Sequence, residues 1–275
     1  MTQPSIKQVA DKLIAKPGKT FRLNDHPSRR KDLFADKSDA RDSLEADAKA
    51  IDALQDKLLA NADKALLVVL QGMDTAGKSG VIRSVFALTS PYGMQVEAFK
   101  APSKVELAHD YLWRIHQAVP RKGRIGIFDR SHYEDVLVVK VRGFASADAV
   151  EQRYGQINAF EQHLTENNVT VLKFMLNVGY EEQGERLCER ITEEHKRWKF
   201  NPGDVEDRKL WPAFMEAYET MVQRCSTDHA PWYIVPADSR TRRNAMIARI
   251  VRGALEDMEL GWPDPGHKLD DFDFG

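Results

Sequence analysis

The hydrophobic residues of this chain follow two alternating patterns. A short continuous apolar run, typical of a strand buried on both faces, occurs at residues 65–70, and less uniform runs that predict further strands occur at 95–100, 124–128, 170–177 and 232–235. Between the runs, apolar residues recur every three or four positions, which predicts helices at 42–58, 78–89, 103–118, 134–141, 146–166, 180–198, 206–226 and 240–258. The alternation predicts an α/β fold with a five-stranded, mainly parallel sheet and helices on both faces.

The ends of the chain differ from this pattern. Residues 1–41 are polar, contain three prolines and carry the basic cluster Arg29, Arg30 and Lys31. They predict an extended arm with one short helix. The 275 residues allow one large α/β domain or two small ones; we favour a single domain and assign it to residues 42–275. Residues 269–275 are acidic and aromatic, which favours a solvated tail.

Composition excludes several classes of protein. With 40 basic and 42 acidic residues the net charge is −2, which argues against a dedicated nucleic-acid binder but allows a local basic channel. Cys188 and Cys225 are too few for a disulfide framework, so we expect both to be reduced. The chain has neither the apolar run of a membrane span nor that of a secretory signal. We therefore expect a cytoplasmic protein without a membrane partner.

The segment Gly72-Met73-Asp74-Thr75-Ala76-Gly77-Lys78-Ser79 fits the P-loop pattern G-x-x-x-x-G-K-[ST]. It follows a predicted strand and opens a predicted helix, so its backbone N–H groups and the helix N-terminus would face a phosphate chain. Lys78 would reach the transferring phosphate and Ser79 would ligate Mg²⁺. Phosphate contacts are expected at Gly72, Thr75, Ala76, Gly77 and Ser79. The alternative is a glycine-rich turn without a ligand.

Two carboxylates accompany the P-loop. Asp74, inside the loop, suits Mg²⁺ ligation or acceptance of a proton from a hydroxyl substrate; alternatively it caps the helix. Asp129 ends an apolar strand 51 residues after Lys78, where P-loop enzymes keep a second Mg²⁺-organising carboxylate. Arg130 is placed to neutralise phosphate oxygens. Glu134 and Asp135, on the next helix, either hold metal-bound water or cap that helix.

Basic residues cluster at two further places. Arg186, Arg190, Lys196 and Arg197 alternate with glutamates in residues 183–199, which fits either a solvated helix with ion pairs or a mobile lid over phosphates. We favour a lid at about 183–211, bent at 201–204, because kinases must exclude water from the phosphoryl group. A second cluster, for which we favour a solvated helix face or a subunit contact, comprises Arg240, Arg242, Arg243, Arg249 and Arg252. The histidines form no catalytic pattern.

Three stretches resemble the family-2 polyphosphate kinases, a branch of the P-loop kinases. They are GMDTAGKSG (72–80), IFDRSHYEDVLVVKVRG (127–143) and RLCERITEEHKRWKFNPGDVEDRKLW (186–211). The P-loop alone is generic, but an Asp within it followed by DRSHYED is specific. The resemblance extends from about Lys19 to the last helix. The run YEDVLVV is similar to that of the class that phosphorylates both nucleoside monophosphates and diphosphates.

The resemblance implies transfer of phosphoryl groups between inorganic polyphosphate and adenine nucleotides, with guanine nucleotides as further candidates. It implies a requirement for Mg²⁺ or Mn²⁺, a P-loop kinase three-layer sandwich with a two-helix lid, and a homodimer or homotetramer. By position, Asp74 and Asp129 would organise the metal. Lys78, Arg130 and Arg190 would hold phosphates and complete the catalytic set.

Two other functions stay open. One is an ATP-dependent kinase for a nucleoside or another small alcohol, in which Asp74 would be the base. The other is a nucleotide-sensing P-loop protein without enzymatic activity. The first function would use ATP rather than polyphosphate as the phosphate donor. The second would show no turnover in the presence of Mg²⁺.

Overall fold

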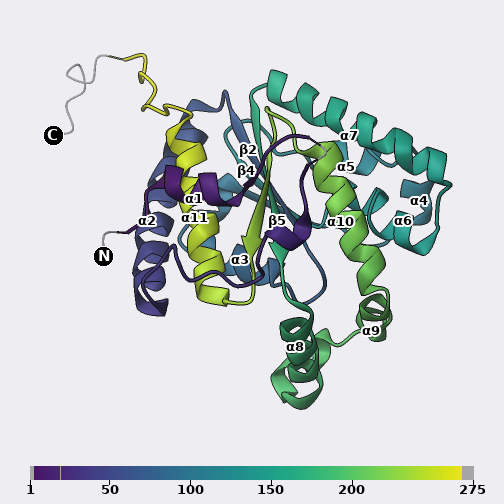
Figure 1. The fold of residues 1–275 in the computed structure, drawn as a ribbon. Coiled ribbons are helices and arrows are strands. Elements are labelled where there is room, and N and C mark those ends of the chain that lie inside the picture. The colour runs from purple at the N-terminus through teal and green to yellow at the C-terminus, as the bar shows by residue number, and fades with distance from the viewer. Residues whose placement is uncertain (1–2, 19, 268–275) are drawn as a thin grey trace.

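A computed structural model describes residues 3–18 and 20–267 (Figure 1). Its centre is a six-stranded sheet of order β1-β6-β5-β2-β4-β3, whose strands are β1 (Ile14–Ala15), β2 (Ala65–Gln71), β3 (Met94–Ala98), β4 (Ile125–Asp129), β5 (Val169–Asn177) and β6 (Trp232–Pro236). Strands β2 to β6 pair in parallel, and β1 pairs antiparallel with β6. The expectation of five strands was therefore wrong by one, because β1 is only two residues long and too short to show a period.

Helices cover both faces of the sheet, as Figure 1 shows. One face carries α1 (Ile6–Leu13), α2 (Lys37–Asn61), α3 (Lys78–Val85) and α11 (Arg240–Glu256). The other face carries α4 (Lys104–Leu107), α5 (Trp113–Ala118), α6 (Val138–Arg142), α7 (Ala147–Glu166) and α10 (Trp211–Cys225). The predicted three-layer α/β class is confirmed.

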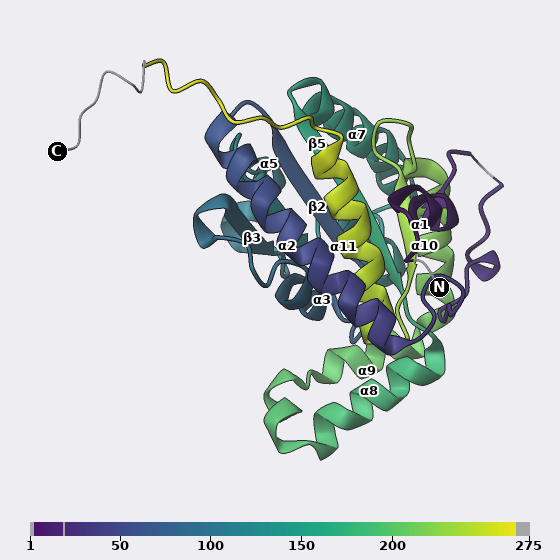
Figure 2. The ribbon, with the colours of Figure 1, turned by 90° about the vertical axis from the view of Figure 1, so that its left-hand side faces the viewer.

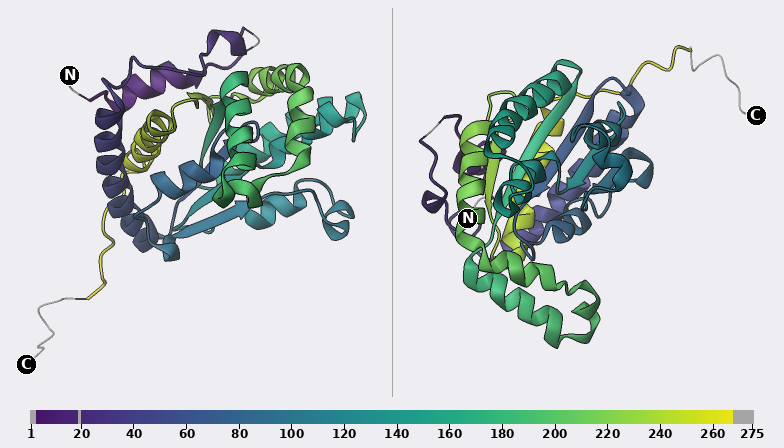
Figure 3. Two further views of the ribbon diagram at one scale, coloured as in Figure 1. Left: turned by 90° about the horizontal axis from the view of Figure 1, so that it is seen from below. Right: turned by 90° about the vertical axis from the view of Figure 1, so that its right-hand side faces the viewer.

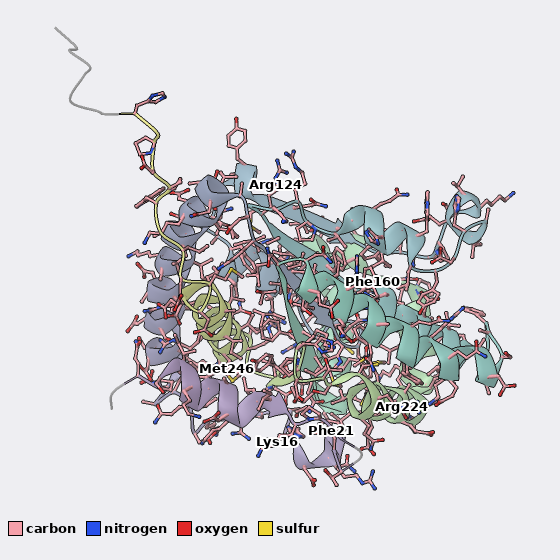
Figure 4. All side chains as sticks on the ribbon, turned by 90° about the horizontal axis from the view of Figure 1, so that it is seen from above. Lys16, Phe21, Arg124, Phe160, Arg224 and Met246 are labelled. Atoms are coloured by element: carbon pink, nitrogen blue, oxygen red, sulfur yellow. The ribbon has the colours of Figure 1, made fainter. Side chains whose placement is uncertain are left out.

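Side chains from both helical layers fill the core (Figure 4). Met246 of α11 and Phe160 of α7 are buried on opposite sides of the sheet. Every residue of the central strand β2 is buried, which explains why its residues 65–70 are all apolar. Cys225 is buried and Cys188 is exposed, and both are free thiols, as expected.

The N-terminal segment packs against the domain rather than extending from it. Besides the expected short helix, α1, it contributes β1 and the 3₁₀ turn η1 (Leu23–Asp25). Val9, Leu13 and Ala15 are buried. Helix α2 begins at Lys37, before the predicted start at Asp42, because the Asp36 side chain accepts hydrogen bonds from the N–H groups of Ser38 and Asp39.

Several long predicted helices are broken. The helix predicted at 78–89 ends at Val85, and a 3₁₀ turn, η2 (Pro91–Gly93), precedes β3. The helix predicted at 103–118 divides into α4 and α5, and that at 134–141 is replaced by the 3₁₀ turn η3 (His132–Asp135) and α6. Neither α4 nor α6 has a buried residue, so the predicted helical period did not reflect a continuous buried face in these stretches. The tail at 269–275 lies outside the described residues.

The predicted lid differs in its internal boundaries. Helix α8 (Tyr180–Thr192) ends before the expected Trp198 and continues as the 3₁₀ helix η4 (Glu194–Lys199). The predicted break at 201–204 instead opens α9 (Pro202–Lys209), where Asn201 accepts a hydrogen bond from the Gly203 N–H and Pro202 takes the first turn. The helix predicted at 206–226 is divided at Leu210, between α9 and α10.

Helices α8 and α9 project beyond the body of the molecule (Figure 2). Seen from below, they lie across the end of the sheet (Figure 3). Since β2, β4 and β5 are parallel, their carboxyl ends meet at this edge, which is where α/β sheets bind ligands. None of the helices in the described ranges combines the length and apolar character that crossing a membrane would require.

Candidate active site

The P-loop connects the end of β2 to the start of α3, and its glycines meet specific steric demands. Gly72 has a φ of 151°, and a Cβ there would lie 2.8 Å from the carbonyl oxygen of Leu176 on β5. Gly77 has a φ of 102° at the N-cap of α3, a region that favours glycine. Thr75 also has a positive φ, 65°. The loop therefore curls around the N-terminus of α3, whose first N–H groups lack intrahelical acceptors.

Lys78 lies across this loop. Its Nζ donates a hydrogen bond of 2.8 Å to the carbonyl oxygen of Gly72, and the residue is buried. Burial, followed by the nearby Arg130 charge, lowers the pKa of Lys78 below its usual value, although Asp74 and Asp129 oppose this. A phosphate that offers negative charge here would relieve the cost of that burial.

Asp129 lies where the sequence places it, at the carboxyl end of β4 and beside β2, with Leu70 opposite it in the register. The Ser79 hydroxyl donates a hydrogen bond of 3.3 Å to Asp129 Oδ2. This contact joins the P-loop helix to the neighbouring strand. Two of the three predicted metal ligands, Ser79 and Asp129, are thus adjacent.

Arg130 links Asp129 to the P-loop carboxylate. Its backbone has a φ of 67°, a conformation that is uncommon outside glycine and is found at functional sites. Arg130 Nη2 lies 2.5 Å from Asp74 Oδ1, and Nη1 lies 3.4 Å from Glu134 Oε2. Burial alone would raise the pKa of Asp74, but the Lys78 and Arg130 charges hold it below its usual value. Glu134 also accepts a hydrogen bond of 3.0 Å from Gln71 at the end of β2.

The lid contributes an ion pair to the same region. Arg190 of α8 donates to Asp204 of α9 over 2.5 Å and to the carbonyl oxygen of Lys199 over 3.2 Å. The Asp204 carboxylate is buried, and this burial, followed by the charge of Asp74, raises its pKa to about 6. Arg190 therefore lies between α8 and α9, the helices of the predicted lid, and lines the cleft.

The other predicted lid cations have different surroundings. Arg186 donates to Glu182 and to the backbone carbonyls of Thr75, Ala76, Ala237 and Asp238. All five N–H groups of a guanidinium are then committed, so a phosphate contact would require one of these bonds to break. Lys196 pairs with Glu189 and Glu193 and lines the cleft, whereas Arg197 is exposed and donates to the carbonyl oxygen of Ile191.

A cleft of about 950 Å³ lies between the P-loop, the end of β4 and the lid. Lys78, Arg130, Arg190 and Lys196 line it, together with the carboxylates Asp74 and Asp129. Another part of its lining is apolar and includes Val138, Val139 and Phe144. Converging cations beside a P-loop suit a polyanionic phosphate chain, and the apolar part suits a flat organic group.

The donor set fits a magnesium ion. Asp74, Asp129 and Ser79 offer the hard oxygen atoms that Mg²⁺ prefers, and Ser79 already contacts Asp129. Within residues 3–18 and 20–267, no group of three or more His, Cys, Asp or Glu residues is arranged to enclose a metal ion. Mg²⁺ commonly binds through one or two carboxylates, with substrate phosphates and water completing the shell.

The second basic cluster differs from the expectation of a solvated face. Arg243 and Arg249 of α11 are buried, so that expectation was wrong for these two residues. Arg249 donates to Asp47 of α2 over 2.7 Å, and Arg243 lies behind the P-loop. Because α11 packs against α2 and α3, the side of α11 that carries Arg243 and Arg249 faces the interior. The basic residues of this helix gave no indication of that burial.

Sequence reasoning also missed partners of the site. Asp204 and Gln71 contact predicted residues from distant segments. A buried group behind Arg130 includes Lys173, whose Nζ lies 2.5 Å from Glu161 Oε2 and donates to the Tyr133 hydroxyl over 2.8 Å. His132 Nε2 lies 3.2 Å from Glu161 Oε1. In the sequence, this buried cluster is indicated only by Lys173, a single lysine within a predicted strand.

Known proteins resemble the chain over nearly its full length. A family model described as Polyphosphate kinase 2 (PPK2) matches residues 34–261. An AMP/ADP-polyphosphate phosphotransferase of Meiothermus ruber is 44% identical over 229 residues, which cover 83% of this chain and 86% of that protein. An ADP-polyphosphate phosphotransferase of Rhodopseudomonas palustris is 36% identical over 259 residues, 90% of each chain. The crystal structure of polyphosphate kinase 2 from Arthrobacter aurescens TC1 superposes with a TM-score of 0.93 at 37% identity, covering 98% of this chain and 96% of that one.

Proposed function

Because the chain belongs to the polyphosphate kinase 2 family, we propose that it transfers phosphoryl groups between inorganic polyphosphate and nucleoside mono- and diphosphates. The observation that carries the proposal is the convergence of Lys78, Arg130 and Arg190 on one cleft beside the P-loop. Two polyanions must approach each other there, and without these cations their repulsion would oppose transfer.

In the reaction, an oxygen of the acceptor's terminal phosphate bonds to the terminal phosphorus of polyphosphate. The bridging P–O bond to the rest of the chain breaks, and polyphosphate leaves shorter by one unit. The acceptor oxygen is already ionised at neutral pH, so a strong base is not needed. Positioning and charge neutralisation by Lys78, Arg130 and Arg190 supply the catalysis.

We assign Mg²⁺ or Mn²⁺ binding to Asp129 and Asp74, with Ser79 as a further oxygen ligand. The ion would neutralise charge on the phosphate oxygens. Residues 183–211, which include most of α8 and all of η4 and α9, would act as the lid, and the arm at 1–41 would belong to the same domain as residues 42–275. Lid closure would exclude water, which otherwise accepts the phosphoryl group.

The acceptor range is the finer part of the proposal. The Meiothermus ruber relative is named for AMP and ADP and the Rhodopseudomonas palustris relative for ADP alone; the run YEDVLVV favours both acceptors. We place the base against the apolar residues Val139 and Phe144, which would also admit guanine. We also propose that the protein forms a homodimer or homotetramer. Its proposed location is the cytoplasm, where these nucleotides are made.

A coupled assay tests this function. The protein, polyphosphate and Mg²⁺ are incubated with AMP, ADP, GMP or GDP, and the products are separated by chromatography. We expect ATP from ADP, and ADP followed by ATP from AMP. ADP turnover with AMP untouched would restrict the acceptors to diphosphates. Transfer only from ATP to a nucleoside would overturn the proposal.

A further inference from the structure

Arg243 occupies an unusual position behind the P-loop. It lies in the first turn of α11, 167 residues from Ala76, and its side chain is nearly enclosed, with 2% of the residue exposed. Its Nη1 donates a hydrogen bond of 2.8 Å to the carbonyl oxygen of Ala76. A Cβ at Gly77 would collide with the same Nη1. The guanidinium therefore fills the space that a side chain at Gly77 would need.

The contact fixes the orientation of one peptide group. In a trans peptide the C=O of one residue and the N–H of the next point in opposite directions. Since Arg243 holds the Ala76 carbonyl on the rear side of the loop, the Gly77 N–H is turned away from Arg243. Gly77 is the N-cap of α3. Its N–H is therefore among the groups that would donate hydrogen bonds to a phosphate at the helix N-terminus.

Within residues 3–18 and 20–267, Arg243 has no anionic partner for its charge. Asn244 accepts from its Nε over 3.0 Å and from its Nη2 over 2.8 Å, but Asn is neutral. Among the described residues, no carboxylate forms an ion pair with Arg243. Its charged neighbours are Arg186 and Arg240, and burial followed by these two cations lowers its pKa to about 9. An uncompensated buried cation is costly unless an anion binds nearby.

We propose that Arg243 is a positioning residue of the phosphate site: it orients the Ala76–Gly77 peptide toward the cleft, and a bound phosphate chain balances its charge. Arg243 lines the same cleft as Lys78. The inference rests on the proposed function only in that the P-loop binds a phosphate chain. It explains why the first turn of α11 carries a buried arginine, although burying its guanidinium costs stability in the free protein.

The test measures binding of inorganic tripolyphosphate with Mg²⁺ by isothermal titration calorimetry. The variants are Arg243→Gln, which removes the charge, and Arg243→Lys, which keeps it but loses the planar fork. Arg252→Gln is the matched control, because it removes one charge from the same helix at a site paired with Asp47 and Glu256.

We expect Arg243→Gln to raise the Kd by about 10–100-fold, the effect of losing a charge-assisted contact. Arg243→Lys should lie between that variant and the wild type, and Arg252→Gln should match the wild type. Thermal unfolding without ligand identifies a folded sample, and Arg243→Lys carries the test alone if Arg243→Gln does not fold.

Two outcomes would overturn the inference. One is a Kd within twofold of the wild type for a folded Arg243 variant. The other is an equal loss of binding in Arg252→Gln, which would show that helix charge in general is responsible. Normal turnover of polyphosphate and AMP by the wild type would leave the proposed function standing in either case. Lack of tripolyphosphate binding to the wild type would contradict both.

Discussion

Lys78 is the residue whose removal separates catalysis from folding most clearly. We expect Lys78→Ala to lower kcat by about 10³-fold or more, the size of effect seen when a charge-stabilising donor is lost from a transition state. The fold should persist, because Nζ makes one hydrogen bond, to the Gly72 carbonyl. Steady-state kinetics and thermal unfolding measure the two effects. The control is Lys49→Ala, which removes an exposed partner of Glu45. Near-normal turnover in folded Lys78→Ala would refute the P-loop assignment.

Asp129 and Glu134 allow a proposed metal ligand to be compared with a proposed supporting residue. Asp129→Asn should lower kcat by about 10²–10³-fold and raise the Mg²⁺ concentration needed for half-maximal rate, because an amide binds Mg²⁺ weakly. Glu134→Gln keeps the shape of a group that contacts Gln71 and Arg130, so we expect a loss of about tenfold. Magnesium titrations of both variants provide the comparison. Equal losses, or an unchanged magnesium requirement in Asp129→Asn, would contradict this ranking.

The predictability of single residues depends on how far apart their partners lie in the chain. The P-loop is contiguous, and Asp129 ends an apolar run, so both were identified from local sequence. Asp204 meets Arg190 across a change of helix, and Arg243 meets Ala76 across 167 residues. Only packing of α11 against the P-loop helix brings the second pair together, and no local pattern encodes it.

Among the elements, the lid carries a pair that should respond to pH. The pKa of Asp204 is raised to about 6 by burial, followed by the charge of Asp74, although Arg190 and Arg130 lower it. A carboxyl whose pKa is raised on folding binds more protons in the folded state, so its contribution to stability grows as the pH falls through 6. The same protonation removes the ionised partner of Arg190.

We therefore expect kcat to fall below about pH 6 as Arg190 loses its partner, and Asp204→Asn to abolish this acid limb while lowering the plateau. Substrate phosphates titrate near the same pH, so the difference between variant and wild type is the decisive quantity. Asp207→Asn is the matched control, because Asp207 is also on α9 but pairs with Arg142. An identical acid limb in Asp204→Asn would refute a role for this pair.

The elements of the lid show why helix boundaries were predicted less well than their existence. Interleaved Arg and Glu residues continue through Thr192 without a break in composition, yet the α-helix ends there and a 3₁₀ segment follows. Asn201 and Pro202 were interpreted as a break, whereas together they form a helix start. In the sequence, Asn201 and Pro202 fit a break and a helix start equally well. Only the conformation of the residues after Pro202 decides between the two.

In the whole molecule, the largest difference from the sequence prediction is the N-terminal segment. Its polar composition hides a few apolar residues that complete the sheet and cover α11. Ile14 and Ala15 pair with Tyr233 and Trp232, a contact across more than two hundred residues. Strands β2, β4, β5 and β6 were predictable because each carries apolar residues of its own, and β3 because it falls in the alternation of strands and helices, whereas β1 is only two residues long and pairs with β6.

This arrangement makes the N-terminal segment a source of stability for the entire domain. Leu13 is 0% exposed and Leu107, a surface control, is 68% exposed. Leu13→Ala should lower the free energy of unfolding by about 2–5 kcal/mol, because it leaves a cavity in the core, whereas Leu107→Ala should change it by no more than about 0.5 kcal/mol. Urea unfolding followed by tryptophan fluorescence measures both, and Trp232, buried beside Ala15, reports locally. Since Leu13 precedes β1, which pairs with the amino-terminal end of β6, whereas the P-loop follows the carboxyl end of β2, kcat of the folded variant should equal that of the wild type. Equal unfolding free energies for Leu13→Ala and Leu107→Ala would instead make this segment a separable arm, with the domain beginning after it.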